Sequence, residues 1–111
     1  MTDDSDRHAA ELLHMLGHLY VKSGDRKRGL VLLLLASHIV PAHTGILHTL
    51  IQAFIVNGDV PRALNAIERL EYVEGQTPIL SLLQSRVLWI DGRHDDARRC
   101  FQDYLQRRED R

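Results

Sequence analysis

Histidine is the residue type in this chain best suited to bind a metal ion or exchange protons, with 7 in 111 residues. His14 and His18 are four residues apart and share one face of a helix, and His48 lies 34 residues after His14. Imidazoles at such spacing are workable ligands for a transition metal. Glu11 is the nearest residue that could complete a ligand set, and it does not do so convincingly. We therefore expect no metal ion and no other cofactor, and interpret the histidines as hydrogen-bonding groups that gain positive charge below about pH 6.5.

The single cysteine, Cys100, is the strongest candidate nucleophile. Its nearest histidine in the sequence, His94, is six residues away, so the two side chains do not share a helix face and cannot form a catalytic pair. Asp95 and Asp96 follow His94 at the start of a predicted helix, where carboxylates complement the helix dipole. The sequence has no glycine-rich phosphate loop and no paired catalytic carboxylates. We therefore predict that the protein is not an enzyme.

The composition also narrows the class of partner. The chain has 14 Lys and Arg against 15 Asp and Glu, and only 5% aromatic residues, which argues against a nucleic-acid surface. The acidic start, MTDDSD, does not resemble a signal peptide. The longest apolar run, Leu30 to Ala36, is far shorter than the roughly 18 residues of a membrane span. One cysteine allows no intrachain disulfide and suits a reducing compartment. These features predict a soluble cytoplasmic protein without nucleic-acid partners or stable membrane insertion.

Apolar residues at steps of three and four predict six helices after a frayed tail over residues 1–6. Asp25 and Asp59 are suited to cap helix starts, and Pro61 and Pro78 fall in first turns, where a missing N–H costs little. The expected helices run from Arg7 to about Gly24, from Asp25 to about Val40, from Thr44 to Val56, from Val60 to Val73, from Pro78 to about Ile90, and from His94 to Arg108.

A 34-residue repeat organises these helices. The three turn glycines are Gly24, Gly58 and Gly92. Five positions after each of them stands a small residue, which lets the two helices of a pair approach closely; these residues are Gly29, Ala63 and Ala97.

This period and these positions resemble the tetratricopeptide (TPR) family. The resemblance implies an all-α single domain over residues 1–111, with repeats at about 10–43, 44–77 and 78–111. The repeats would form a short right-handed superhelix with a concave groove. Two residues depart from the family pattern: Ile51 stands where a small residue is usual, and Gly75 where proline is usual.

TPR resemblance implies that the first helix of each pair lines the concave groove. The inward positions that we expect to bind a partner are His14, His18, Val21, His48, Gln52, Ile55, Ile79, Leu82, Arg86 and Trp89. Truncating Trp or Arg at a binding surface often costs about 2 kcal/mol or more, although Trp89 could instead pack between helices. The basic clamp with which some TPR proteins grip a terminal carboxylate is absent, so that kind of co-chaperone function is not expected.

The outer face of the second helix of each pair gives a different signal. In the second and third repeats this face is polar, but in the first repeat it carries Val31, Leu34, Leu35 and His38. An apolar outer face predicts a protein contact. The alternative is that the N-terminal segment folds over it. The last helix has one apolar stripe and a polar back, so we expect it to end the array without a further helix.

The segment RVLWIDGRHDDARRCFQDYLQRR, residues 86–108, resembles the YscY/SctY-type export chaperones of bacterial type III secretion systems. The similar positions are Gly92, Asp95, Ala97, Arg98, Phe101, Gln102, Tyr104 and Leu105, followed by a short charged tail. The resemblance implies a chaperone that binds and stabilises a small secreted partner of the SctX type in the bacterial cytoplasm. The pair would then engage the export gate at the inner membrane.

Two related readings stay open. One is a chaperone of the needle subunit from the same secretion system. The other is a generic TPR adaptor, or a homodimer that buries the convex patch when the partner is absent.

Overall fold

The computed structural model describes residues 4–109 as an all-α chain. Its helices are packed in pairs, α1 with α2, α3 with α4 and α5 with α6, an arrangement compatible with three helix-turn-helix repeats. Their bounds are α1 Asp4–Lys22, α2 Arg26–Ile39, α3 Thr44–Val56, α4 Val60–Glu74, α5 Pro78–Ile90 and α6 His94–Glu109. The expected all-α class and the pairing of the helices are confirmed.

The turn within each pair depends on its glycine. Gly24, Gly58 and Gly92 have φ angles of 96°, 70° and 82°, a region in which a side chain would be strained. The residue after the first two glycines caps the next helix. The side chain of Asp25 accepts from the backbone N–H of Arg28 (3.2 Å), and that of Asp59 accepts from Arg62 (3.3 Å). One short sequence motif therefore reverses the chain and starts the next helix.

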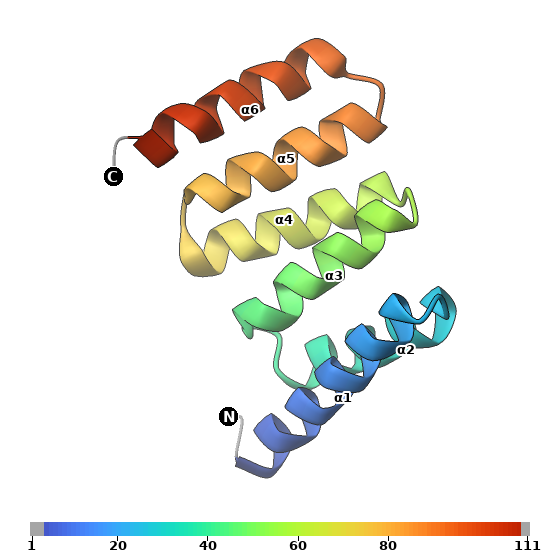
Figure 1. The fold of residues 1–111 in the computed structure, drawn as a ribbon. Coiled ribbons are helices and arrows are strands. Elements are labelled where there is room, and N and C mark those ends of the chain that lie inside the picture. Colours follow the sequence, from blue (N-terminus) through green and yellow to red (C-terminus); the bar gives the residue numbers. More distant parts are fainter. Residues whose placement is uncertain (1–3, 110–111) are drawn as a thin grey trace.

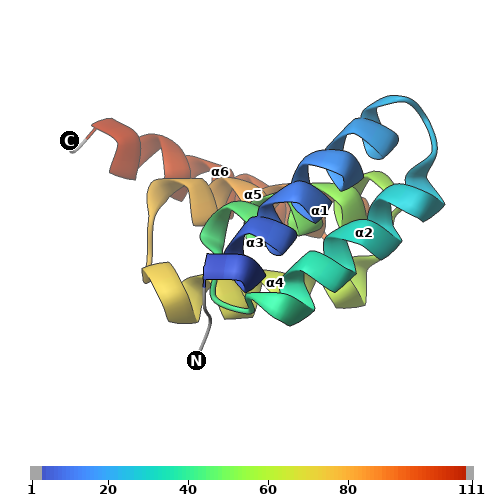
Figure 2. The ribbon, with the colours of Figure 1, turned by 90° about the horizontal axis from the view of Figure 1, so that it is seen from below.

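The pairs follow one another along the array in chain order (Figure 1). The first helix of a later pair packs against the preceding pair: α3 contacts α2 and α1, and α5 contacts α4 and α3. The chain enters at one end of the array and leaves at the other, and Figure 2 looks at the end formed by α1 and α2. The core runs through all three pairs, with α3 supplying many of its largest side chains, including Ile46, Leu47, Leu50 and Ile51.

Small residues bring the helices of a pair into close contact, as their repeat position predicts. Gly29 is buried, and a Cβ atom built on it would lie 2.5 Å from Cγ2 of Val21 and 2.8 Å from the carbonyl oxygen of Gly17. Ala63 and Ala97 are buried at the equivalent positions of the next two pairs. The α1–α2 pair thus has no room for a side chain where the other pairs hold a methyl group.

Two details differ from the expectation. Helix α1 begins at Asp4, before the apolar pattern starts, so residues 4–6 are not a frayed tail; acidic side chains in a first turn favour helix. Residues 1–3 of that expected tail lie outside the described residues. Gly75, which stands where the repeat pattern expected a proline, caps the end of α4 with φ 79° and donates its N–H to the carbonyl oxygen of Glu71 (2.7 Å). Within the described chain, no helix combines the length and hydropathy of a membrane span.

Candidate protein-binding surfaces

A groove runs between α1 and α3 on one face of the array. It is formed by two adjoining hollows that share His18 and Thr49. Five of the residues expected in a concave groove line it: His14, His18, Val21, His48 and Gln52. We call this surface the α1–α3 groove.

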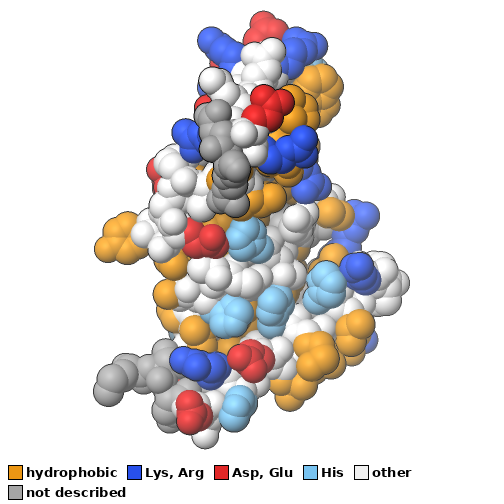
Figure 3. All heavy atoms as spheres, turned by 60° about the vertical axis from the view of Figure 1, so that its left-hand side comes forward, with side chains coloured by type: hydrophobic (Ala, Val, Ile, Leu, Met, Phe, Trp, Pro, Cys, Tyr) orange, Lys and Arg blue, Asp and Glu red, His pale blue; other side chains and the backbone are white. Residues whose placement is uncertain are grey.

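Hydrogen bonds within the α1–α3 groove hold its polar side chains in place. The hydroxyl of Thr49 donates to the carbonyl oxygen of Gly45 (3.0 Å), so its oxygen accepts from Nε2 of His14 (2.7 Å). His48 donates to Oε1 of Glu74 (3.1 Å). Figure 3 shows several histidine side chains close together on one face of the molecule. The groove is therefore preorganised for polar contacts, which favours a ligand with hydrogen-bonding groups.

Histidine electrostatics limit the positive charge of this groove. The pKa of His14 is held below its ordinary value of 6.5, first by burial and then by repulsion from His43 and His18. The His43 ring lies edge-on to that of His14, with centroids 6.0 Å apart, and its Nδ1 accepts from the N–H of Ile46 at the start of α3. His14 thus prefers to be neutral beside a helix start that another imidazole caps.

The other expected groove residues lie elsewhere. Ile55 is buried, because α5 packs beside it, and it belongs to the core rather than to a ligand surface. Ile79 is exposed in the first turn of α5, and it lines neither hollow of the α1–α3 groove. Arg86 donates to Oε1 of Gln52 (2.8 Å) and so touches the groove edge through α3. Leu82 and Trp89 line a different hollow.

This second hollow, the end groove, lies between α5 and α6 at the C-terminal end of the array and encloses about 360 Å³. Its lining residues are Leu82, Ser85, Arg86, Trp89, Ala97, Arg98, Phe101 and Gln102. The Trp89 ring stacks on that of His94, with centroids 4.0 Å apart, and the Arg98 guanidinium lies 5.8 Å from the Trp89 ring centroid. The sequence predicts that the apolar stripe of α6 faces inward. Phe101 instead leaves 43% of its surface exposed in this groove.

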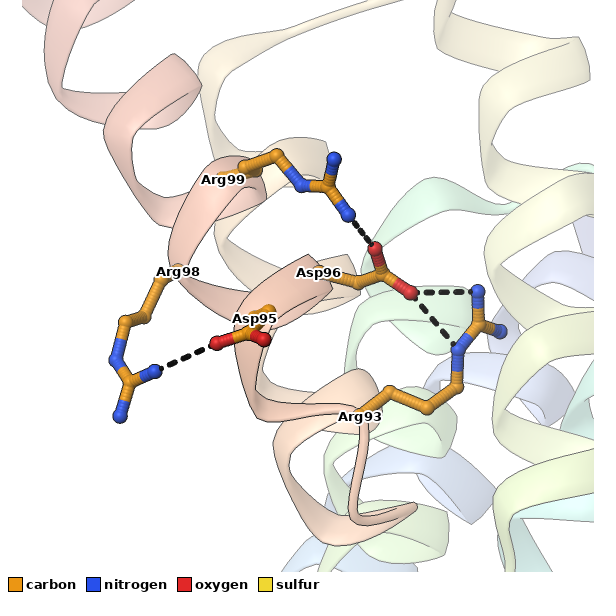
Figure 4. A network of polar contacts seen from close by, with 5 residues as sticks. All are labelled: Arg93, Asp95, Asp96, Arg98 and Arg99. Carbon is orange, nitrogen blue, oxygen red and sulfur yellow. Dashed lines mark hydrogen bonds and ion pairs between the residues drawn. The ribbon is translucent and has the colours of Figure 1, made fainter.

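Ion pairs fix the first turn of α6 beside the end groove (Figure 4). Asp96 accepts from the guanidinium groups of Arg93 (2.9 and 3.1 Å) and Arg99, and these hydrogen bonds hold the pKa of the Asp96 carboxyl below its usual range. Asp95 accepts from Arg98 (2.9 Å). Such exposed pairs contribute little to stability, but the second one orients Arg98 at the groove.

The convex patch consists of Val31, Leu34, Leu35 and His38 on α2. All of these side chains are exposed, and Val31 and Leu35 expose 56% and 49% of their surface. Beside it a groove of about 440 Å³ is lined by Leu16, Tyr20, Lys27, Arg28, Val31 and Leu32. Residues 4–22 form α1 rather than a cover over this patch. The patch is thus an apolar surface that residues 4–109 leave exposed.

Helix α1 adds apolar exposure that the sequence reasoning missed. Leu12, Met15, Leu16 and Leu19 are all exposed. Apolar residues at steps of three and four, Leu12, Leu16 and Leu19 among them, predicted the helix but not its exposure, because no helix pair precedes α1 in the described chain.

The spacing of the histidines first suggested a set of metal ligands. Within residues 4–109, no group of three or more His, Cys, Asp or Glu side chains could hold a metal ion. Cys100 is half-buried on α6. No family model matches the chain, and no curated protein matches it in a sequence comparison. The fold and surfaces therefore define this protein as an all-α array of helix pairs with exposed apolar and polar grooves.

Proposed function

We propose that the protein is a TPR-type binding scaffold that covers an apolar helix of a partner protein, acting as an export chaperone of type III secretion. The observation that carries this proposal is the convex patch on α2. At the equivalent positions of α4 and α6 the exposed residues are polar, as in Asn65, Glu68 and Arg99. Only the first pair replaces a solvated face with leucine and valine, in a fold that does not need them for its own packing.

The physical basis of such binding is removal of apolar surface from water. Burial of apolar surface contributes about 25 cal/mol per Å². Each roughly 100 Å² of apolar surface buried, summed over the two partners, therefore stabilises a complex by about 2.5 kcal/mol before the entropy cost of ordering is subtracted. The patch and the adjoining groove of Leu16 and Val31 present a continuous strip on which an amphipathic helix could lie. A secreted protein with an exposed apolar helix would otherwise self-associate, and coverage by the chaperone prevents this.

The partner class follows from the resemblance of residues 86–108 to YscY/SctY-type chaperones. It is a small secreted protein of the SctX type, bound in the bacterial cytoplasm and presented to the export gate. The hydrogen-bonded α1–α3 groove supplies a second contact, suited to an extended polar segment of the same partner. Nanomolar affinity corresponds to about -12 kcal/mol, more than one hot spot supplies, so two surfaces acting together fit the proposal.

Co-expression with an SctX-type protein from the same genome tests the proposal. Wild-type protein should keep the partner soluble and co-purify with it, while Leu34→Asp and Val31→Asp should lose the partner with far-UV circular dichroism unchanged. Asn65→Asp is the matched control, because it places the same charge at the position of α4 equivalent to Val31. A partner that stays bound to all three variants would contradict the role of the convex patch.

A further inference from the structure

The exposed face of α1 is at the repeat positions that α3 and α5 use to pack on the pair before them. Leu12 aligns with Ile46 and Leu80, which are fully buried. Leu19 is exposed, although it aligns with Ala53 and Val87, which are buried. Helix α1 thus carries the packing face of an internal helix but has no preceding pair within residues 4–109 to cover it.

The end groove corresponds to the opposite side of this contact, the surface of a helix pair on which the first helix of the next pair packs. Trp89 and Ala97 of this groove align with Ile55 and Ala63, which line one hollow together with Val87 of α5. Phe101 aligns with Leu33 and Ile67, which are buried. Tyr104 is half-buried, although it aligns with buried Ala36 and Leu70. Among residues 4–109, no helix lies on this surface of the C-terminal pair.

We propose that these two surfaces bind each other between copies of this chain: α1 of one copy lies in the end groove of the next, in the way that α3 and α5 lie on their preceding pairs. The occupant of the end groove is a second copy because this chain itself carries a helix with the matching register. The proposal goes beyond the binding of a secreted partner. It also uses other residues, because α2 makes no packing contact with α4 in the internal joints, so the convex patch stays free.

Charge supports this docking direction. In the internal joints the chain passes directly from one helix to the next, so α3 begins beside the end of α2 and α5 beside the end of α4. A docked α1 would begin beside the end of α6. The first turn of α1 is acidic, with Asp4 and Asp6, and the last turn of α6 is basic, with Arg107 and Arg108. Opposite charges would meet at this end of the joint.

The contact joins two different surfaces, so it is heterologous and leaves a free end on each outer copy. In the structure these ends lie at opposite ends of the array (Figure 1). Association would therefore continue into short chains as concentration rises, whereas a contact of the convex patch with itself would stop at a dimer.

Two variants and their mixture test the proposal. Leu12→Glu places a charge on the exposed apolar face of α1, and Trp89→Glu places one in the end groove. Sedimentation velocity should show wild-type protein associating beyond a dimer as concentration rises. Each variant alone should stay monomeric, with a dissociation constant raised about tenfold or more. Mixed together, they should form a complex of one copy of each, because the Trp89→Glu copy still has an intact α1 and the Leu12→Glu copy an intact groove.

Trp89 is the single tryptophan of the chain, so its fluorescence reports on the end groove directly. In the mixture the only tryptophan belongs to the Leu12→Glu copy. Its emission should shift to shorter wavelength when the Trp89→Glu copy, which has no tryptophan, is added and covers the groove. If Trp89→Glu loses its helical circular dichroism, Phe101→Glu takes its place in the sedimentation test.

The Leu34→Asp variant distinguishes self-association from binding of the secreted partner. It should associate with itself as the wild type does, and Leu12→Glu should still bind the secreted partner. Three results would each overturn the inference: a wild type that stays monomeric, a mixture that stays monomeric, or loss of self-association in Leu34→Asp. Loss of partner binding alone would overturn only the proposed function.

Discussion

Trp89 and Ile55 occupy the same position in successive helix pairs, yet Ile55 is 7% exposed and Trp89 is 50% exposed. The difference arises because α5 covers the first of these positions and, within the described residues, no helix covers the second. A repeat array leaves such a surface wherever it ends, and here the uncovered side chain is a large aromatic. The same reasoning applies at the other end, where α1 exposes leucines.

Replacing Gly29 with alanine tests the close packing of the first pair. The new methyl group would meet the backbone carbonyl of Gly17 at 2.8 Å, which cannot move without shifting α1. Overpacking of this kind costs about 1–3 kcal/mol, and the higher helix propensity of alanine offsets about 1 kcal/mol of it. Urea denaturation should show a net loss of stability. Lys27→Ala, an exposed change on the same helix, should stay within about 0.5 kcal/mol of wild type.

Replacing Asp59 tests the repeated turn motif. Asp59→Ala removes the acceptor for the Arg62 N–H at the start of α4 and should cost about 1 kcal/mol in urea denaturation. Asp59→Asn keeps a capping oxygen and should lose only a few tenths of a kcal/mol. The ion pair of Asp59 with Arg62 is exposed, so Arg62→Ala should have little effect. Equal losses in the alanine and asparagine variants at position 59 would assign the effect to charge rather than to capping.

Stability should fall as the solution is acidified through the range of histidine titration. The pKa of His14 is lower in the folded protein than its ordinary value of 6.5, so the unfolded chain binds the proton first. The contribution of His14 is therefore complete above about pH 6.5 and is lost as pH falls towards the pKa of the folded state. His14→Gln can still donate to Thr49 but does not titrate. The urea midpoint of this variant should change less between about pH 7.5 and pH 5.5 than that of wild type; equal changes would contradict the role of His14.

Much of the fold could be predicted from the sequence because its determinants are local. Glycines such as Gly58 and caps such as Asp25 fix turns by their own backbone and side-chain chemistry, so five of the six helix starts were expected to within one residue. Acidic residues before the apolar pattern hid the true start of α1 at Asp4. The TPR assignment rests on the pattern of these positions and remains a proposal.

The surfaces were harder to predict because they depend on what lies beside each helix. The histidines of the α1–α3 groove were placed by repeat position. Ile55 follows the same rule but is buried by α5. Phe101 lies on the apolar stripe of α6, yet it is exposed because no helix within the described residues covers it. The position of a residue in the repeat predicts the direction in which its side chain points, but the adjacent helices determine whether that side chain is exposed.

In the proposed function, the convex patch of α2 holds the secreted partner. Site-specific photo-cross-linking tests it most directly, with the photoreactive residue placed at Leu34 in one protein and at Glu68, its equivalent on α4, in another. We expect a cross-link to the SctX-type partner from position 34 and none from position 68. A cross-link from position 68 alone, or equally from both positions, would contradict it.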